Sequence, residues 1–200
     1  MIILYMVNPQ EYYFPFLVED GLAEWLTFAM LSCSFAVSLY LFLKKRAHEN
    51  RWFFLLFSMF CLFGALEEIS WGQRVFDIQS SEFFVNNSDQ GEINAHNVFQ
   101  KWFRIKTKHV AGIVLLVYGM FLPTLANRRP AIKKRIEKQF FLLPPLHLRW
   151  SFLLGTLMMM DWPTGQEEEL GEMSFSICLF LFLLYELQWE ETEQESSKAA

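Results

Sequence analysis

Long apolar runs, separated by short polar stretches, set the pattern of this sequence. Four are evident, at residues 22–43, 52–71, 109–126 and 170–189, and the second has a polar end after Leu66. A helix needs about 20 apolar residues to cross the hydrocarbon core of a bilayer. Such runs are typical of helices, which satisfy their own backbone hydrogen bonds in lipid. The pattern therefore predicts an all-α fold, a polytopic transmembrane helical bundle.

A fifth apolar stretch, residues 142–162, is ambiguous. Pro144 and Pro145 interrupt it, and Arg149 lies within it. The part from Trp150 onward is too short to cross a full bilayer as a straight helix. The segment can start with a kink and cross, or it can be re-entrant. We expect a crossing, which gives about five membrane segments.

Basic residues predict the orientation of these segments. Most of the 17 lysines and arginines lie within residues 44–51 and 127–149. Cytoplasmic loops carry such an excess, so the amino terminus, the loop 72–108 and the turn at 161–169 are expected outside. Residues 101–108 are basic and aromatic but fall on the outer side. They are typical of an amphipathic segment that lies in the membrane interface.

Composition supports a single integral membrane domain over residues 1–189. Hydrophobic residues make up 53% of the chain, and phenylalanine alone occurs 22 times. A soluble domain of this size would struggle to bury so many large apolar side chains, whereas lipid removes the difficulty. Residues 190–200 form an acidic tail that is expected to be disordered.

Charge and cysteine content exclude some functions. The net charge of −5 opposes nucleic-acid binding, which requires a basic face. Cys33, Cys61 and Cys178 each lie in an apolar run, and no two have metal-ligand spacing. We interpret them as small buried hydrophobes rather than as disulfide partners or zinc ligands.

Ionisable residues at the ends of the runs carry the candidate chemistry, because charge at the edge of lipid is costly. Glu67 and Glu68 close the second run, and they point about 100° apart on a helix. In the outer loop, Glu92 and His96 are four residues apart and would share one helix face. The two glutamates and His96 also have explanations in which they serve structure alone. The glutamates suit a helix end with snorkelling side chains, and His96 suits a hydrogen-bonded loop histidine.

A third polar group precedes and opens the last run. Asp161 comes before a Pro-Thr-Gly turn, Glu167 and Glu168 follow it, and Glu172 lies deeper. The positive end of the helix dipole favours the first glutamates there and explains Glu172 less well. Glu24 lies one turn inside the first run, on the same side of the membrane. We therefore expect these groups to converge in a shared pocket at the outer rim of the bundle.

Two motifs carry a resemblance. Residues 67–74 and 91–97 resemble a group of uncharacterised bacterial multi-pass membrane proteins, in which Glu-Glu-x-Ser-x-Gly-Gln is followed by Glu-x-Asn-x-His-Asn. Residues 19–25 are also similar. The resemblance covers most of the chain and implies a bacterial cytoplasmic (inner) membrane. It assigns no activity.

Our first hypothesis is a metal-dependent enzyme that acts on a lipid or lipid-linked substrate at the outer leaflet. Carboxylates with one histidine suit Mg²⁺, Ca²⁺, Mn²⁺ or Fe²⁺ better than structural zinc. The candidate metal ligands are Glu68, Glu92, His96 and Glu172, and the candidate general bases are Glu67 and Asp161.

The alternative is a non-enzymatic structural or accessory subunit of a membrane complex. Its aromatic spans would pack against partner helices, and its polar residues would latch helix ends together. A transporter is disfavoured, because it would need polar residues near the midplane of the bilayer, and the runs carry almost none there.

Overall fold

The structure is a computed structural model that describes residue 8 and residues 14–17, 21–44, 50–88, 91–139, 141–160 and 167–199. This described part contains helices and no strand, which confirms the all-α prediction. The elements are, in chain order, α2 (Phe14–Leu17), α3 (Leu22–Lys44), α4 (Arg51–Glu68), η2 (Ser70–Gly72), α5 (Gln73–Phe76), α6 (Glu82–Asn87), α7 (Ala95–Phe103), α8 (Thr107–Leu116), η3 (Val117–Phe121), α9 (Leu122–Arg128), α10 (Pro130–Glu137), η4 (Leu146–Leu148), α11 (Arg149–Met159) and α12 (Glu168–Ala199).

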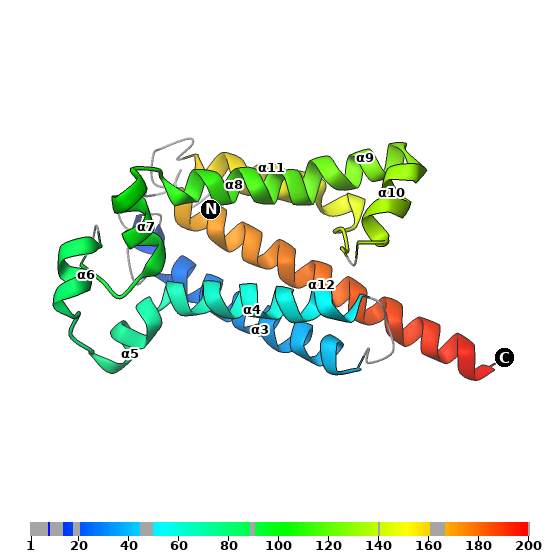
Figure 1. Cartoon of the computed structure of the whole chain (residues 1–200), viewed down its shortest axis with the longest axis horizontal. Helices are drawn as coiled ribbons and strands as arrows, with labels where there is room; N and C mark the ends of the chain where they lie inside the picture. Colours follow the sequence, from blue (N-terminus) through cyan, green and yellow to red (C-terminus); the bar gives the residue numbers. More distant parts are fainter. Residues whose placement is uncertain are drawn as a thin grey trace.

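The long helices pack side by side in an order that differs from their order in the chain. α3 and α4 form a hairpin, and α12 lies along α3 (Figure 1). α11 packs between α12 and α8, which continues through the π-helical turn η3 into α9. The short helices α5, α6 and α7 lie at one end of the molecule and α10 at the other (Figure 1). We call these the α7 end and the α10 end.

Three helices are long and apolar enough to cross a membrane among the residues that the structure describes. They are α3, the continuous helix Thr107–Arg128, and the Glu168–Trp189 part of α12. These match three of the apolar runs and support an integral membrane protein.

The other two expected segments are not confirmed as spans. α4 packs against α3 over its whole length, but its 18 residues include Arg51, Glu67 and Glu68. α11 has only 11 residues. That is a rise of about 16 Å, roughly half of the hydrocarbon core. Pro144 and Pro145 explain the short helix, because residues 141–145 before η4 are not helical and Pro145 has an extended backbone.

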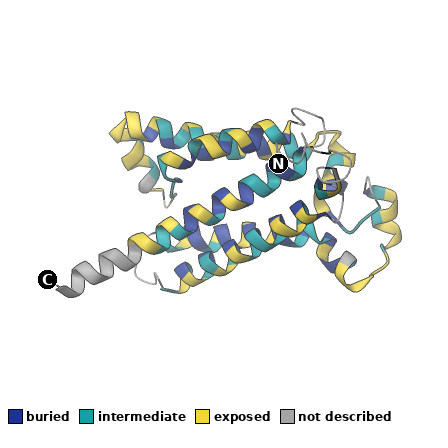
Figure 2. Cartoon of the chain, turned by 180° about the vertical axis from the view of Figure 1, so that it is seen from behind, coloured by how far each residue is buried: buried dark blue, intermediate teal, exposed yellow. Residues whose placement is uncertain are grey.

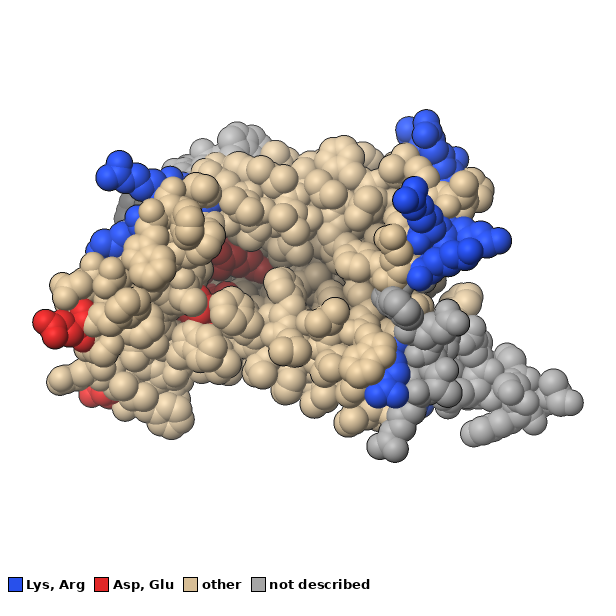
Figure 3. Space-filling view, in the orientation of Figure 1, with Lys and Arg blue, Asp and Glu red and all other residues tan. Residues whose placement is uncertain are grey.

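The surface supports placement in a bilayer. Many residues on the long helices are exposed (Figure 2), and they include large apolar side chains such as Leu56 at 67% and Val114 at 58%. Figure 3 shows charged side chains gathered at the two ends, with an uncharged band between them on this face. In water such a band would be costly, whereas against lipid tails it needs no further partner.

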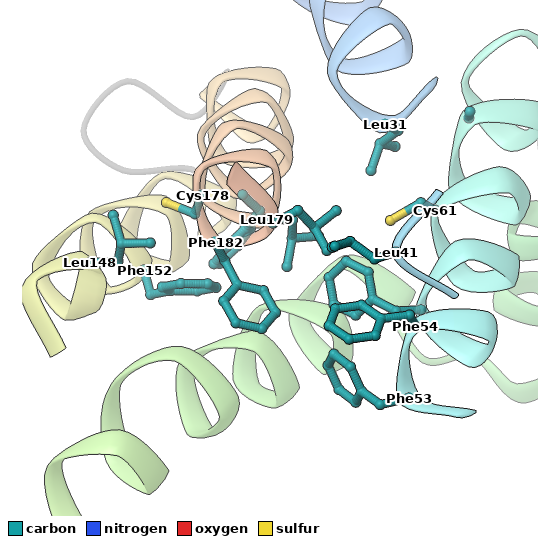
Figure 4. Close-up of a cluster of buried hydrophobic side chains, with 14 of the residues drawn as sticks. Leu31, Leu41, Phe53, Phe54, Cys61, Leu148, Phe152, Cys178, Leu179 and Phe182 are labelled. Atoms are coloured by element: carbon teal, nitrogen blue, oxygen red, sulfur yellow. The ribbon is translucent and has the colours of Figure 1, made fainter. Parts of the chain in front are cut away.

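Aromatic side chains fill the interior between the packed helices. Phe53, Phe54, Phe152 and Phe182 lie in one cluster with Leu41 (Figure 4). Phe53 and Phe182 meet edge to face with ring centroids 6.1 Å apart. This geometry places the positive edge of one ring against the negative face of the other.

Small residues allow the closest helix approaches. A Cβ atom added at Gly171 of α12 would lie 2.4 Å from Met159 Cγ and 2.9 Å from the carbonyl oxygen of Gly155, both on α11. A Cβ at Gly119 would lie 2.1 Å from the ring of Phe152. Helices in lipid have no hydrophobic driving force toward one another, so close contacts of this kind hold them together.

The carboxyl-terminal stretch differs from the expectation of disorder. α12 continues beyond Trp189 as a helix to Ala199. Glu, Gln, Lys and Ala, which make up most of this stretch, are good helix formers and extend a helix that has already been nucleated.

Candidate functional site

The α7 end begins where α4 stops abruptly. Ser70, Trp71 and Gly72 adopt φ values of 46°, 55° and 85°, so three consecutive residues lie in the left-handed region. Glycine accepts this conformation readily, but serine and tryptophan are strained in it. The turn ends α4 and directs the chain out of the bundle into α5.

Glu67 lies in the last turn of α4 and is 7% exposed. Its Oε1 accepts hydrogen bonds from Trp71 Nε1 at 2.5 Å and from the backbone N–H of Ala95 at 3.1 Å. Its Oε2 accepts the backbone N–H of His96 at 2.9 Å and lies 3.1 Å from His96 Nδ1. One carboxylate therefore holds both its own helix end and the start of α7.

The start of α7 is built to receive this carboxylate. Asn94 caps the helix, and its Oδ1 accepts the backbone N–H of His96 at 3.2 Å. The Nδ2 of Asn94 donates to the backbone carbonyl of Glu67 at 3.2 Å. The free N–H groups and positive dipole end of a helix favour a negative charge at this position.

Further hydrogen bonds join the same two segments. Ser70 Oγ donates to Glu92 Oε2 at 2.7 Å. The backbone N–H of Ile93 donates to Gln73 Oε1 at 2.7 Å. We call this set of contacts between residues 67–73 and 92–96 the clasp. The two motifs picked out in the sequence are thus the two halves of one structure.

The clasp sets the charge state of Glu67. Burial by itself would raise the pKa of this carboxyl group. Hydrogen bonds from His96, Trp71 and Ala95 outweigh burial and leave the pKa below its ordinary value. Glu67 is therefore ionised at neutral pH and acts as an acceptor at both oxygens.

His96 combines one fixed ring nitrogen with an exposed ring. Because the Glu67 carboxylate can only accept, the hydrogen of a neutral His96 ring belongs on Nδ1. The side chain is 48% exposed. Its Nε2 makes no hydrogen bond or ion pair with the described residues. Glu67 thus fixes the tautomer of His96 and leaves the lone pair of Nε2 available.

A second group of charges surrounds Glu172 on α12. Glu172 interacts electrostatically with His96 of α7, Glu24 of α3 and Lys108 of α8. Lys108 also forms an ion pair with Glu168, one turn before Glu172. In Figure 3, acidic side chains lie on the floor of a hollow between the α8 and α4 edges of this face, near the α7 end.

The structure brings some of the expected site residues together. Glu67 and His96 are in direct contact, Glu172 lies within electrostatic range of His96, and Glu92 is engaged by Ser70. Glu68 is half-buried on α4, and Asp161 lies outside the described residues. Among the described residues, no three His, Cys, Asp or Glu side chains are grouped so that they could hold a metal ion.

Sequence reasoning missed several members of this site. Ser70 donates and Gln73 accepts within the clasp, and Trp71 donates to Glu67. All three residues lie in the motif 67–74, which was the available signal. Lys108 was interpreted as part of an interfacial segment. Its proximity to Glu168 and Glu172 depends on α8 and α12 lying at the same end of the bundle, which no local pattern encodes.

Comparison with known proteins adds no relative: no family model, no curated protein and no solved structure matches this chain.

Proposed function

We propose that this protein is a multi-pass membrane enzyme that acts on the headgroup of a lipid or lipid-linked substrate at the outer leaflet. The observation that carries the proposal is the contact between Glu67 and His96, 3.1 Å from Oε2 to Nδ1, at the α7 end of an apolar bundle. In this proposal the chain has five membrane segments, its amino terminus lies outside, and the membrane is a bacterial inner membrane.

The surface of the α7 end supports placement at headgroup depth. Phe99, Trp102 and Phe103 of α7 are at least half exposed, as are Phe76 and Phe83 of α5 and α6. Lys101 and Arg104 lie beside them in the chain. Aromatic rings with adjacent cations are typical of segments that lie in the bilayer interface. A site beside such a surface meets lipid headgroups.

His96 is the acid–base group of the proposed enzyme. A neutral imidazole with its hydrogen on Nδ1 accepts a proton at Nε2, and the adjacent carboxylate stabilises the imidazolium that forms. Glu67 acts through His96 and is a positioning residue, because both of its oxygens are already occupied. It is therefore poorly placed to serve as the general base itself.

A divalent cation is also part of the proposal. Magnesium is commonly held by one or two protein carboxylates together with phosphate oxygens of the substrate. Glu172 would supply the protein carboxylate and phosphate oxygens of the lipid would complete the shell, so that Nε2 of His96 stays available for proton transfer.

The test is turnover in proteoliposomes that contain phosphatidylglycerol, phosphatidylethanolamine and a polyprenyl phosphate, with headgroup products identified by mass spectrometry. Wild type should release a product that His96→Ala does not. His109→Ala is the matched control, since His109 also lies near the α7 end, at the start of α8. Turnover measured after chelation with EDTA tests whether the reaction requires the proposed divalent cation. If wild type releases no product, or if His96→Ala releases the same amount, the proposed enzymatic function is wrong.

A non-enzymatic accessory subunit is the second candidate, and the clasp itself favours it. Five side chains, Glu67, Ser70, Gln73, Glu92 and Asn94, make hydrogen bonds that join helix ends and so serve structure. The exposed aromatic face of α5–α7 would then meet a partner protein. Native mass measurement in mild detergent distinguishes the two, since a stable larger complex without turnover favours the subunit.

A further inference from the structure

A second site lies at the α10 end, far from the clasp. A cavity of about 480 Å³ opens between α9 and α10 on one side and the end of the apolar part of α12 on the other. The non-helical segment 141–145 forms a third wall, and Asn50, just before α4, contributes to the rim. Cavities of this size are typical of sites for small molecules and lipids.

The lining of the cavity is divided between apolar and polar side chains. Ala126, Phe141, Leu142 and Trp189 provide apolar surface, and Phe141 also packs edge to face on Tyr118. Lys133 and Glu186, with Asn127, provide charged and polar groups in the same cavity. An occupant that matches both parts must be amphipathic.

The charge around the cavity selects the sign of the occupant. The end of α9 and the α10 region carry an exposed basic group made of Arg128, Arg129, Lys133, Lys134, Arg135 and Lys138. Figure 3 shows Lys and Arg side chains gathered at the α10 end of this face. Several cations at the end of a spanning helix attract the anionic phosphates of a lipid surface.

We propose that this cavity binds an anionic glycerophospholipid of the cytoplasmic leaflet. Its phosphate lies against Lys133 and the neighbouring basic side chains, and the start of an acyl chain lies against Phe141 and Trp189. Glu186 accepts hydrogen bonds from hydroxyl groups of the headgroup. A soluble phosphate would match the basic rim but would leave the apolar wall uncovered. This inference rests on the membrane placement of the bundle and is independent of the chemistry at His96.

The experiment is native mass spectrometry of the full chain in mild detergent, titrated with dioleoyl-phosphatidylglycerol, dioleoyl-phosphatidylcholine or inorganic phosphate. Lys133→Glu reverses a charge that lines the cavity, and Lys134→Glu reverses one beside it that does not. Ala126→Phe fills the cavity from a buried position, and Leu125→Phe adds the same ring at a 39% exposed position.

Phosphatidylglycerol should bind to wild type and to both control variants. It should bind about tenfold more weakly to Lys133→Glu, the loss expected for one charge-assisted contact, and at least as much more weakly to Ala126→Phe, whose ring takes the space of the acyl chain. Equal binding by all variants, or equal retention of phosphatidylcholine, would overturn the inference, because either identifies unspecific surrounding lipid. Displacement of the lipid by inorganic phosphate would also overturn it, in favour of a soluble anion. Lys133→Glu keeps the test valid if Ala126→Phe does not fold.

Discussion

Glu67 and His96 are 29 positions apart in the chain, and Oε2 of the glutamate accepts the backbone N–H of the histidine at 2.9 Å while lying 3.1 Å from its ring Nδ1. The same oxygen therefore fixes both the backbone and the side chain of His96. The helix that carries Glu67 and the helix that carries His96 cannot move independently without breaking both contacts. This coupling makes the α7 end a defined structure rather than a loop that rests on the bundle.

Glu67→Gln should loosen the start of α7. Glutamine has nearly the same shape, but it is neutral and its nitrogen cannot accept, so at least one of the hydrogen bonds now made to Glu67 is lost. We expect a loss of about 1–3 kcal/mol, typical of a hydrogen bond to a charged group. Thermal unfolding in detergent measures it, together with hydrogen exchange of the amides of residues 95–103. Glu68→Gln is the control, and equal effects of the two variants would contradict the role of Glu67.

The contribution of Glu67 should depend on pH in a definite direction. Hydrogen bonds lower the pKa of Glu67 in the folded protein despite its burial, so the folded form binds this proton less readily than the unfolded chain, whose pKa is about 4.3. Its stabilisation is present above the unfolded pKa and is lost as pH falls through the folded pKa. The difference in melting temperature between wild type and Glu67→Gln should therefore be full at pH 7 and shrink in acid. A difference that grows in acid would have the wrong sign.

Gly171→Ala should weaken the packing of α12 on α11. The added methyl group would lie 2.7 Å from the backbone nitrogen of Met159, which cannot move without shifting α11. Overpacking of this kind costs about 1–3 kcal/mol. Gly64→Ala is the matched control, because its nearest neighbour is the flexible end of Leu31 at 3.1 Å. Melting temperatures of the two variants test the difference, and a larger loss from Gly64→Ala would contradict it.

Tyr118→Phe should remove a hydrogen bond that ties the π-helical turn η3 to the proline segment. The Tyr118 hydroxyl donates to the carbonyl oxygen of Leu142 at 3.0 Å. We expect a cost of about 1 kcal/mol, which corresponds to about 2–4 °C in melting temperature for a chain of this size. Tyr40→Phe, at a position 50% exposed, should change little. A shift of the same size in both variants would show that the Leu142 contact contributes nothing.

The sequence predicted the helices best where a chain in lipid must satisfy its own backbone hydrogen bonds and therefore forms a helix. The run 109–126 must form a helix if it lies in a bilayer, and it lies within the continuous helix Thr107–Arg128. The segment 142–162 was less predictable, since the outcome depended on how two prolines bend the chain before α11. The tail was harder still, because the same residues favour both solvation and helix formation.

The site was predictable only in outline. Glu67, Glu92 and His96 could be picked out because ionisable residues beside lipid require a reason. Which of two adjacent glutamates faces α7 depends on the rotational phase of α4, and that phase is set by packing of residues such as Phe54 and Cys61 in the core. The left-handed turn at Ser70 and Trp71 carries no sequence signal, because neither residue type favours positive φ.

The clasp also closes the chain between Gln73 and Glu92 into a loop, because hydrogen bonds hold both of its ends together. Residues 77–79 in this loop are exposed and follow α5. Lengthening a loop that is already closed costs little entropy, since the cost grows only with the logarithm of its length. A peptide tag inserted there would be displayed at the membrane surface without disturbing the bundle. The molecule therefore offers its own attachment point for a reporter of sidedness.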